Sequence, residues 1–214
     1  KGGSTLIFLD PYAETEISRQ QGVPPMNPRS NLKKLLDTWG IKFDDKKAVL
    51  DAEYGFRISR NINGRDIQVT NYPWLNIRGD GLNQNESSLS NLSTIVLTTA
   101  GSFISNNDKI MLEPIITSSI KSGLGDAQMA GNPKGDPRDL LSDIKAKDQK
   151  HIVSGWIKSD LKTSFQNFKK SDDTEQLMKS TNKSNILLVS DADMLMDRNW
   201  LTQRGAFANN GDFV

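Results

Sequence analysis

The sequence predicts an α/β fold with a mostly parallel sheet and an added β-hairpin region. Three apolar runs of strand length are separated by segments with helical periodicity, which is the pattern of an α/β core. Two alternating segments around Asn63-Gly64 add an antiparallel hairpin. The chain of 214 residues is long enough for one domain. We therefore expect residues 1–214 to form a single α/β domain, with the hairpin inserted near residues 54–72.

The first predicted unit is a strand, a helix and a second strand. Residues 5–9 form an apolar run, and the polar, proline-rich segment after it is expected to be a loop. A helix follows, with Ser30 or Asn31 as its cap. Its apolar side chains recur at the spacing of one helix face, at Leu32, Leu35, Leu36 and Trp39. A short strand over residues 47–50 completes the unit.

The middle of the chain carries the hairpin and weaker signals. Residues 56–62 and 65–70 alternate apolar and polar side chains on either side of a two-residue turn, and the hairpin is expected to end at residues 72–75. Beyond it we expect, in order, a loop over residues 76–93, short strands over residues 95–97 and 109–117, and irregular structure over residues 118–134.

The last third predicts one more helix and two strands. Asp136-Pro137 favours a helix start, because an aspartate cap is followed by proline at the first helical position. A strand is predicted over residues 151–161 and a charged linker over residues 167–184. The final strand, residues 185–190, leads into a helix-like stretch that contains Met194, Leu195 and Trp200.

Composition excludes several classes of function. The 27 Lys and Arg balance 26 Asp and Glu, and no segment is basic enough for a nucleic-acid surface, so we expect no DNA or RNA partner. There is no cysteine, which removes thiol nucleophiles, disulfides and thiolate metal sites. No apolar run approaches the roughly 18 to 20 residues of a membrane span. Lys1-Gly2-Gly3 is typical of the end of a preceding helix, so we expect the sequence to be a piece of a longer protein.

Aspartates stand at the ends of the first and last strands. Asp10 follows the first strand, and Asp191 and Asp193 follow the last. If the two strands are parallel in one sheet, the three carboxylates lie on the same rim, where α/β sheets keep their ligand sites. Such a cluster could hold Mg²⁺ or position a water for hydrolysis. The alternative, which we favour, is that the aspartates cap the following segments and accept backbone N–H groups.

Other sites for catalysis are weak. His151 is the only histidine and follows a charged segment, and no Gly-x-Ser-x-Gly motif is present, which argues against a serine hydrolase. No glycine cluster stands between a strand and a helix as a phosphate cradle would. The tryptophans are expected in the core, with Trp74 as the best exception for stacking on a sugar. We predict no metal and no cofactor.

Four blocks of sequence, in order and spacing, resemble the auxiliary component of gliding-motility-type ABC transporters. They are residues 2–14, 30–41, 189–198 and 207–214. The resemblance implies an extracytoplasmic domain at the periplasmic face of the bacterial inner membrane, held between membrane helices that lie outside this sequence and working beside an ABC permease and an ATPase. It also implies a flavodoxin-like fold related to class I glutamine amidotransferases, without their catalytic cysteine.

The sequence therefore predicts a non-catalytic binding and scaffolding domain rather than an enzyme. Its hypothetical ligand is a small molecule or an oligosaccharide, bound at the rim that carries Asp10, Tyr12, Glu14, Asp191 and Asp193. The alternative hypothesis is that the protein is a metal-dependent hydrolase that uses the same carboxylates. A third reading is a purely structural spacer between membrane segments, which would have no pocket at the rim.

Overall fold

The computed structural model describes most of the chain. The described residues are 3–16, 28–62, 64–106, 110–132, 136–144, 149–165 and 178–213. Its strands are β1 (Ser4–Phe8), β2 (Ile41–Phe43), β3 (Lys47–Asp51), β4 (Gly55–Ile62), β5 (Arg65–Arg78), β6 (Thr94–Thr98), β7 (Phe103–Ser105), β8 (Leu112–Thr117), β9 (Ser122–Asp126), β10 (Ile152–Ser159), β11 (Ser184–Val189), β12 (Leu201–Thr202) and β13 (Gly205–Ala206). The α-helices are α1 (Lys33–Trp39), α2 (Ala127–Ala130) and α3 (Asn210–Phe213), and the 3₁₀ turns are η1 (Gly79–Gly81), η2 (Pro137–Asp143), η3 (Asp193–Leu195) and η4 (Asp197–Asn199).

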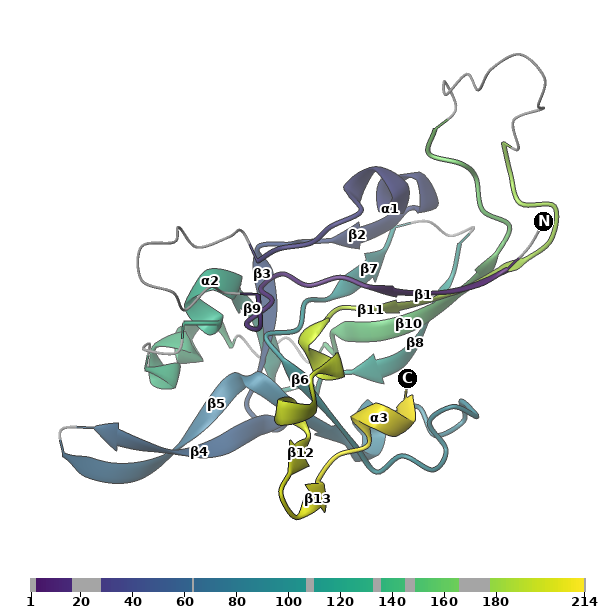
Figure 1. Cartoon of the computed structure of the whole chain (residues 1–214). Coiled ribbons are helices and arrows are strands. Elements are labelled where there is room, and N and C mark those ends of the chain that lie inside the picture. Colours follow the sequence, from purple (N-terminus) through teal and green to yellow (C-terminus); the bar gives the residue numbers. More distant parts are fainter. Residues whose placement is uncertain are drawn as a thin grey trace.

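A six-stranded sheet forms the centre of the molecule, with the order β1-β11-β10-β7-β2 and with β8 also paired to β10 (Figure 1). Strands β1 and β11 run parallel, whereas the other described pairs are antiparallel. The α/β class is correct, but the prediction of a mostly parallel sheet is wrong. Parallel neighbours need crossover helices, and in the described part of the chain the longest α-helix, α1, has only seven residues. The flavodoxin-like and amidotransferase-like arrangement stays a prediction.

The predicted strand-helix-strand unit does not form within one sheet. Both strands and the helix exist, but β3 pairs antiparallel with β9 in a separate two-stranded sheet. Helix α1 ends at Gly40, which has φ 70° and donates its N–H to the carbonyls of the last turn, as a helix-ending glycine does. Leu32 occupies the cap position without a side-chain hydrogen bond, and the Ser30 hydroxyl instead accepts the backbone N–H of Asp10 at 2.9 Å.

The hairpin is confirmed and is longer than expected. Ile62 pairs with Arg65, which fits a hairpin with two residues between its strands, and Gly64 has φ 78°. Strand β5 continues past Pro73 to Arg78 and pairs with β6 in a three-stranded sheet. Pro73 is tolerated because the pairing of β4 with β5 shifts register at this point, where a missing N–H breaks no ladder bond.

Several weaker predictions need correction. Residues 118–132, expected to be irregular, contain β9 and α2. The sequence did not indicate β9, because its glycines interrupt the apolar pattern that predicts a strand. They are required there, since a Cβ on Gly123 would lie 2.3 Å from the carbonyl oxygen of Asp143. The helix predicted after Asp136 is the 3₁₀ turn η2, with the Asp136 cap confirmed. The helix-like stretch around Met194 consists of the turns η3 and η4. Most of the predicted linker, residues 166–177, lies outside the described residues.

Both faces of the central sheet are buried, because alternate side chains of β11 enter different clusters. Ile186 and Leu188 join a cluster that includes Leu36 and Trp39 of α1. Leu187 and Val189 join a larger cluster that contains side chains of β5 and β6. Figure 1 shows the resulting layers, with α1 on one side of the sheet and strands β4 to β6 on the other. Among the described residues, no helix has the length and apolar character needed to cross a membrane.

Candidate functional site

The ends of strands β1 and β11 meet at one point, as the sequence predicted. Ser4 to Phe8 pair in parallel register with Asn185 to Val189, which places the residues after both strands on the same rim. The carboxylates of Asp10, Asp191 and Asp193 are buried, and one oxygen of each lies within 4.8 Å of the others. We call these three residues the carboxylate cluster.

Two members of the cluster bind the backbone of neighbouring loops. Asp10 accepts the N–H of Tyr12 at 2.8 Å through Oδ1 and the N–H of Ala192 at 2.9 Å through Oδ2. Asp191 accepts the N–H of Thr98 at 2.5 Å and the N–H of Met194 at 3.1 Å. Each carboxylate therefore has a backbone donor on both oxygens and joins segments that are far apart in the sequence.

Asp193 binds the loop that follows β1. Its Oδ2 accepts the N–H of Glu14 at 2.6 Å, and its Oδ1 accepts the N–H of Thr15 at 3.3 Å and also the Thr15 hydroxyl. The cluster thus fixes the backbone of residues 12–15 from two sides. This is the backbone-binding role that the sequence favoured, although the carboxylates join loops and the 3₁₀ turn η3 has no side-chain cap.

The cluster retains protons in the folded state. Burial raises the pKa of Asp10 to about 8, in spite of the two N–H donors, and the charge of Asp193 adds to the increase. Burial and the nearby Asp10 raise the pKa of Asp191 well above its ordinary value. Like charges at this separation in a buried site cannot all be ionised. At neutral pH the cluster therefore holds at least one proton.

Glu14 lies next to the cluster and is held by side chains. Its Oε1 accepts the indole N–H of Trp74 at 2.9 Å and the hydroxyl of Thr99 at 2.6 Å. Burial raises the pKa of Glu14, against the lowering effect of these two donors. Among the described residues none donates a hydrogen bond to Oε2.

Thr99 has an unusual backbone. Its φ of 58° makes it the one described residue other than glycine in the left-handed region, a conformation that costs a β-branched residue about 1–2 kcal/mol. Its N–H donates to the carbonyl of Pro73 at 2.9 Å, next to Trp74. Strained residues of this kind concentrate at functional sites, and here the strained residue holds Glu14.

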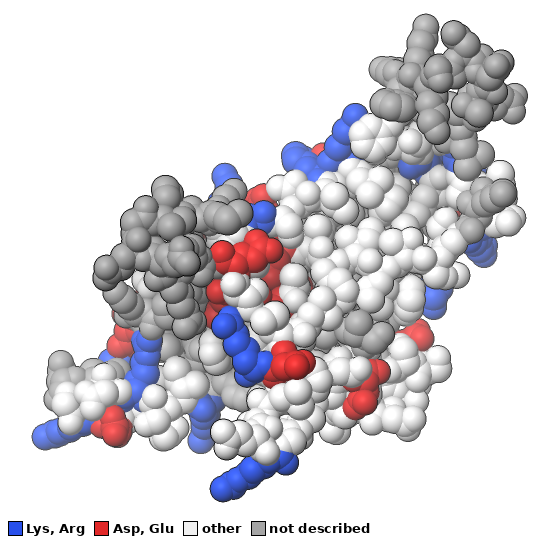
Figure 2. Space-filling model, in the orientation of Figure 1, with Lys and Arg blue, Asp and Glu red and all other residues white. Residues whose placement is uncertain are grey.

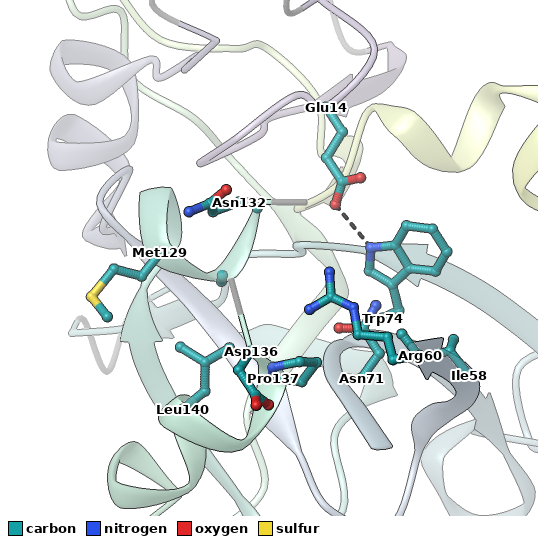
Figure 3. Close-up of a pocket in the computed structure, with 12 residues that line it drawn as sticks. Glu14, Ile58, Arg60, Asn71, Trp74, Met129, Asn132, Asp136, Pro137 and Leu140 are labelled. Carbon is teal, nitrogen blue, oxygen red and sulfur yellow. Dashed lines mark hydrogen bonds between the residues drawn. The ribbon is translucent and has the colours of Figure 1, made fainter. Parts of the chain in front are cut away.

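A cavity of about 240 Å³ opens beside Glu14, and we call it the Glu14 cavity (Figure 3). Its walls come from the loop after β1, from strands β4 and β5, and from the α2–η2 region. The side chains that matter most for its chemistry are Glu14, Arg60, Asn71, Trp74, Met129 and Leu140. On the face drawn in Figure 2, acidic side chains gather near the middle of the molecule, with a basic side chain close by.

The structure separates the five predicted ligand residues. Asp10, Asp191 and Asp193 form the buried cluster, and of the five only Glu14 lines the cavity. Tyr12 packs on Gly131 so closely that a Cβ at this glycine would lie 2.0 Å from the ring. Whether these residues bind a ligand stays a prediction, but Glu14 is the one whose position at the cavity would let it contact a ligand there.

Sequence reasoning missed most of the cavity wall. Trp74 was predicted as the tryptophan best suited to stack on a sugar, and the structure places it in strand β5. Thr98 ends the strand β6 and Thr99 follows it, and this polar strand end could have been recognised in the sequence, because polar residues also follow β1 and β11. Arg60, Asn71 and Met129 carried no signal. His151 lines a different cavity, of about 550 Å³.

Comparison with known families gives a match over the whole chain. A family model described as an ABC-type uncharacterized transport system matches residues 1–214. Comparison with curated proteins and comparison with solved structures found no match. Because the family model spans the whole chain, the protein belongs to this family and is an auxiliary component of an ABC-type transport system.

Proposed function

We propose that this chain is a non-catalytic binding and scaffolding domain of a gliding-motility-type ABC transport system. The domain works at the periplasmic face of the bacterial inner membrane, beside the permease and the ATPase, and presents the Glu14 cavity to a small molecule or an oligosaccharide. The family membership supports the transport context. The location, the gliding-motility type and the partners rest on the resemblance of the four sequence blocks described above.

The hydrogen bonding of the cluster carries the non-catalytic part of the proposal. A general base or a metal ligand needs an oxygen that can face a substrate, a water or an ion. Asp10, Asp191 and Asp193 are each no more than 1% exposed, and both oxygens of each accept hydrogen bonds from the protein. These acids therefore stabilise the loops, and we assign ligand binding to the cavity beside them.

A blocking variant tests the binding function. Met129 is 56% exposed and lines the cavity, so Met129→Trp should fill it without disturbing the core, whereas Met178→Trp, also at an exposed methionine, is the matched control. A thermal-shift screen of sugars, peptides and divalent ions should give hits on the wild type and on Met178→Trp that disappear on Met129→Trp. If no compound stabilises the wild type, or if Met129→Trp keeps the hits, the cavity is not a binding site.

The scaffolding part needs the full protein in its membrane. Affinity purification of the longer protein should retrieve an ABC permease and ATPase in stoichiometric amounts. Copurification with neither subunit would count against the scaffold.

The competing function is a metal-dependent hydrolase, and one observation favours it. The three carboxylates are close enough for one oxygen of each to contact a single cation. Binding of Mg²⁺ or Mn²⁺ would then have to displace the retained protons and the N–H donors. Calorimetric titration at pH 6 and at pH 8 decides the matter, because tight binding at pH 8 together with metal-dependent ester or phosphoester hydrolysis would establish the enzyme.

A further inference from the structure

The Glu14 cavity has two chemically different sides. Figure 3 shows Met129 and Leu140 across the cavity from Glu14 and Trp74. Asn71 and Arg60 extend the polar side below Glu14. A ligand that fits both sides must be a small molecule that carries an apolar surface and a set of polar groups.

The polar side mixes donors and acceptors. Glu14 Oε2 is an acceptor with no described donor, and the side-chain amide of Asn71 both donates and accepts. A hydroxyl group both donates and accepts, so neighbouring hydroxyls on one ring can satisfy such a mixture. An ammonium group only donates and a carboxylate only accepts, and either would leave part of the wall unpaired.

The charges around the cavity balance. Asp136 forms a bidentate pair with Arg138, in which Nε donates to Oδ1 at 3.0 Å and Nη2 donates to Oδ2 at 2.6 Å. These bonds, with a smaller effect of the Arg60 charge, lower the pKa of Asp136 to about 2. Within the described part of the wall, the guanidinium groups of Arg60 and Arg138 thus offset the carboxyl groups of Glu14 and Asp136. The site favours a neutral ligand.

The size of the cavity limits the ligand to about one ring. Pockets for drug-sized ligands are commonly about 300–1,000 Å³, and this cavity holds about 240 Å³. Trp74 contributes a partly exposed indole whose N–H is already bonded to Glu14, so the ring system is fixed in place. A fixed aromatic side chain loses little conformational entropy when a ligand packs against it.

We propose that the Glu14 cavity binds one neutral sugar ring, with Glu14 Oε2 accepting a ligand hydroxyl and with Trp74, Met129 and Leu140 contacting its apolar surface. This inference rests on the binding function proposed above and names its ligand class. The sugar is a free monosaccharide or the terminal unit of a glycan, which share this chemistry.

The test compares matched ligands and matched variants. Tryptophan fluorescence and calorimetry are used to measure binding of glucose, galactose and N-acetylglucosamine, with glucuronate and glucosamine as charged analogues and Gly-Gly as an amide control. Maltose and a longer glycan distinguish a single ring from a chain end. We expect a neutral sugar to bind at least tenfold more tightly than its charged analogues and Gly-Gly.

Glu14→Gln is the decisive variant. Glutamine keeps an oxygen for Trp74 and Thr99 but replaces Oε2 with a donor, so the fold should be kept while sugar affinity falls about tenfold or more. Glu16→Gln, at an exposed position two residues away, should bind as the wild type does. Unchanged affinity in Glu14→Gln would overturn the assignment of the site.

The remaining outcomes separate the two proposals. Tighter binding of glucuronate, glucosamine or Gly-Gly than of every neutral sugar would overturn the ligand class, while the binding function stands. If no compound of any class binds in a way that Met129→Trp abolishes, the binding function and the sugar inference fail together.

Discussion

Raising the pH from 5 to 7 should destabilise this protein, because the carboxylate cluster releases protons that the folded state prefers to keep. The pKa of Asp10 is about 8 in the folded protein and 3.8 in its ordinary state. Between these values the folded chain binds a proton that the unfolded chain has lost. The stability from this proton is fully present below about pH 4 and is lost as the pH rises through 8.

The loss of stability between pH 5 and pH 7 follows from the number of pH units over which the folded chain keeps this proton. One retained proton changes the free energy of unfolding by about 1.4 kcal/mol per pH unit, so two units lower it by about 2.7 kcal/mol. The raised pKa values of Asp191 and Glu14 act in the same direction. For a chain of this length the midpoint of thermal unfolding should fall by about 5–10 °C.

Urea unfolding followed by tryptophan fluorescence at pH 5, 6 and 7 measures this slope. Carboxyl ¹³C shifts of labelled aspartate report the titration of the cluster directly. Asp10→Asn has no carboxyl proton at this position, so its slope should be flatter by about 1.4 kcal/mol per pH unit, whatever its absolute stability. A free energy of unfolding that is constant or rises from pH 5 to 7 would refute the protonated cluster.

Two further predictions concern the framework of the site, and both are measured by urea unfolding at constant pH. Asp191→Ala leaves two buried N–H groups without acceptors and should lower the free energy of unfolding by about 3 kcal/mol, whereas Asp197→Ala, at an exposed residue, should change it by less than about 0.5 kcal/mol. Equal effects would mean that the cluster is not structural. Gly131→Ala places a Cβ against the Tyr12 ring and should cost about 1–3 kcal/mol, whereas Gly3→Ala has no neighbour within 4 Å and should be near neutral. Tolerance of alanine at 131 would contradict the packing of Tyr12.

Local features were predictable because their causes are local. The helix α1 follows from apolar spacing and a terminal glycine, and the hairpin follows from alternation around Asn63-Gly64. The meeting of Asp10 with Asp191 was also predictable, since two apolar strands with acidic ends place those ends together when they pair in parallel. The helix and the hairpin need no knowledge of the rest of the chain, whereas the meeting of the two aspartates also requires that their strands pair in parallel.

Strand direction and partner choice were not predictable in the same way. An apolar strand such as β10 has side chains suited to either direction, and only the tertiary path decides that it runs antiparallel to β11. The strand β9 contains glycines at 123 and 125 because another segment approaches its backbone, and this requirement cannot be recognised from the residues of β9 alone. The cavity is also non-local, because it joins Glu14 to strands β4 and β5 and to α2.

The arrangement changes which acid should be studied as the functional one. The three aspartates were the most visible acids in the sequence, but a carboxylate that holds two backbone N–H groups has little left to offer a ligand. Glu14 is different, since its backbone is held by Asp193 and its Oε1 by Trp74 and Thr99, whereas no described residue donates a hydrogen bond to its Oε2. The cluster therefore contributes to binding by fixing the position of Glu14. This division of roles explains why variants of the cluster should change stability, whereas Glu14→Gln should change affinity.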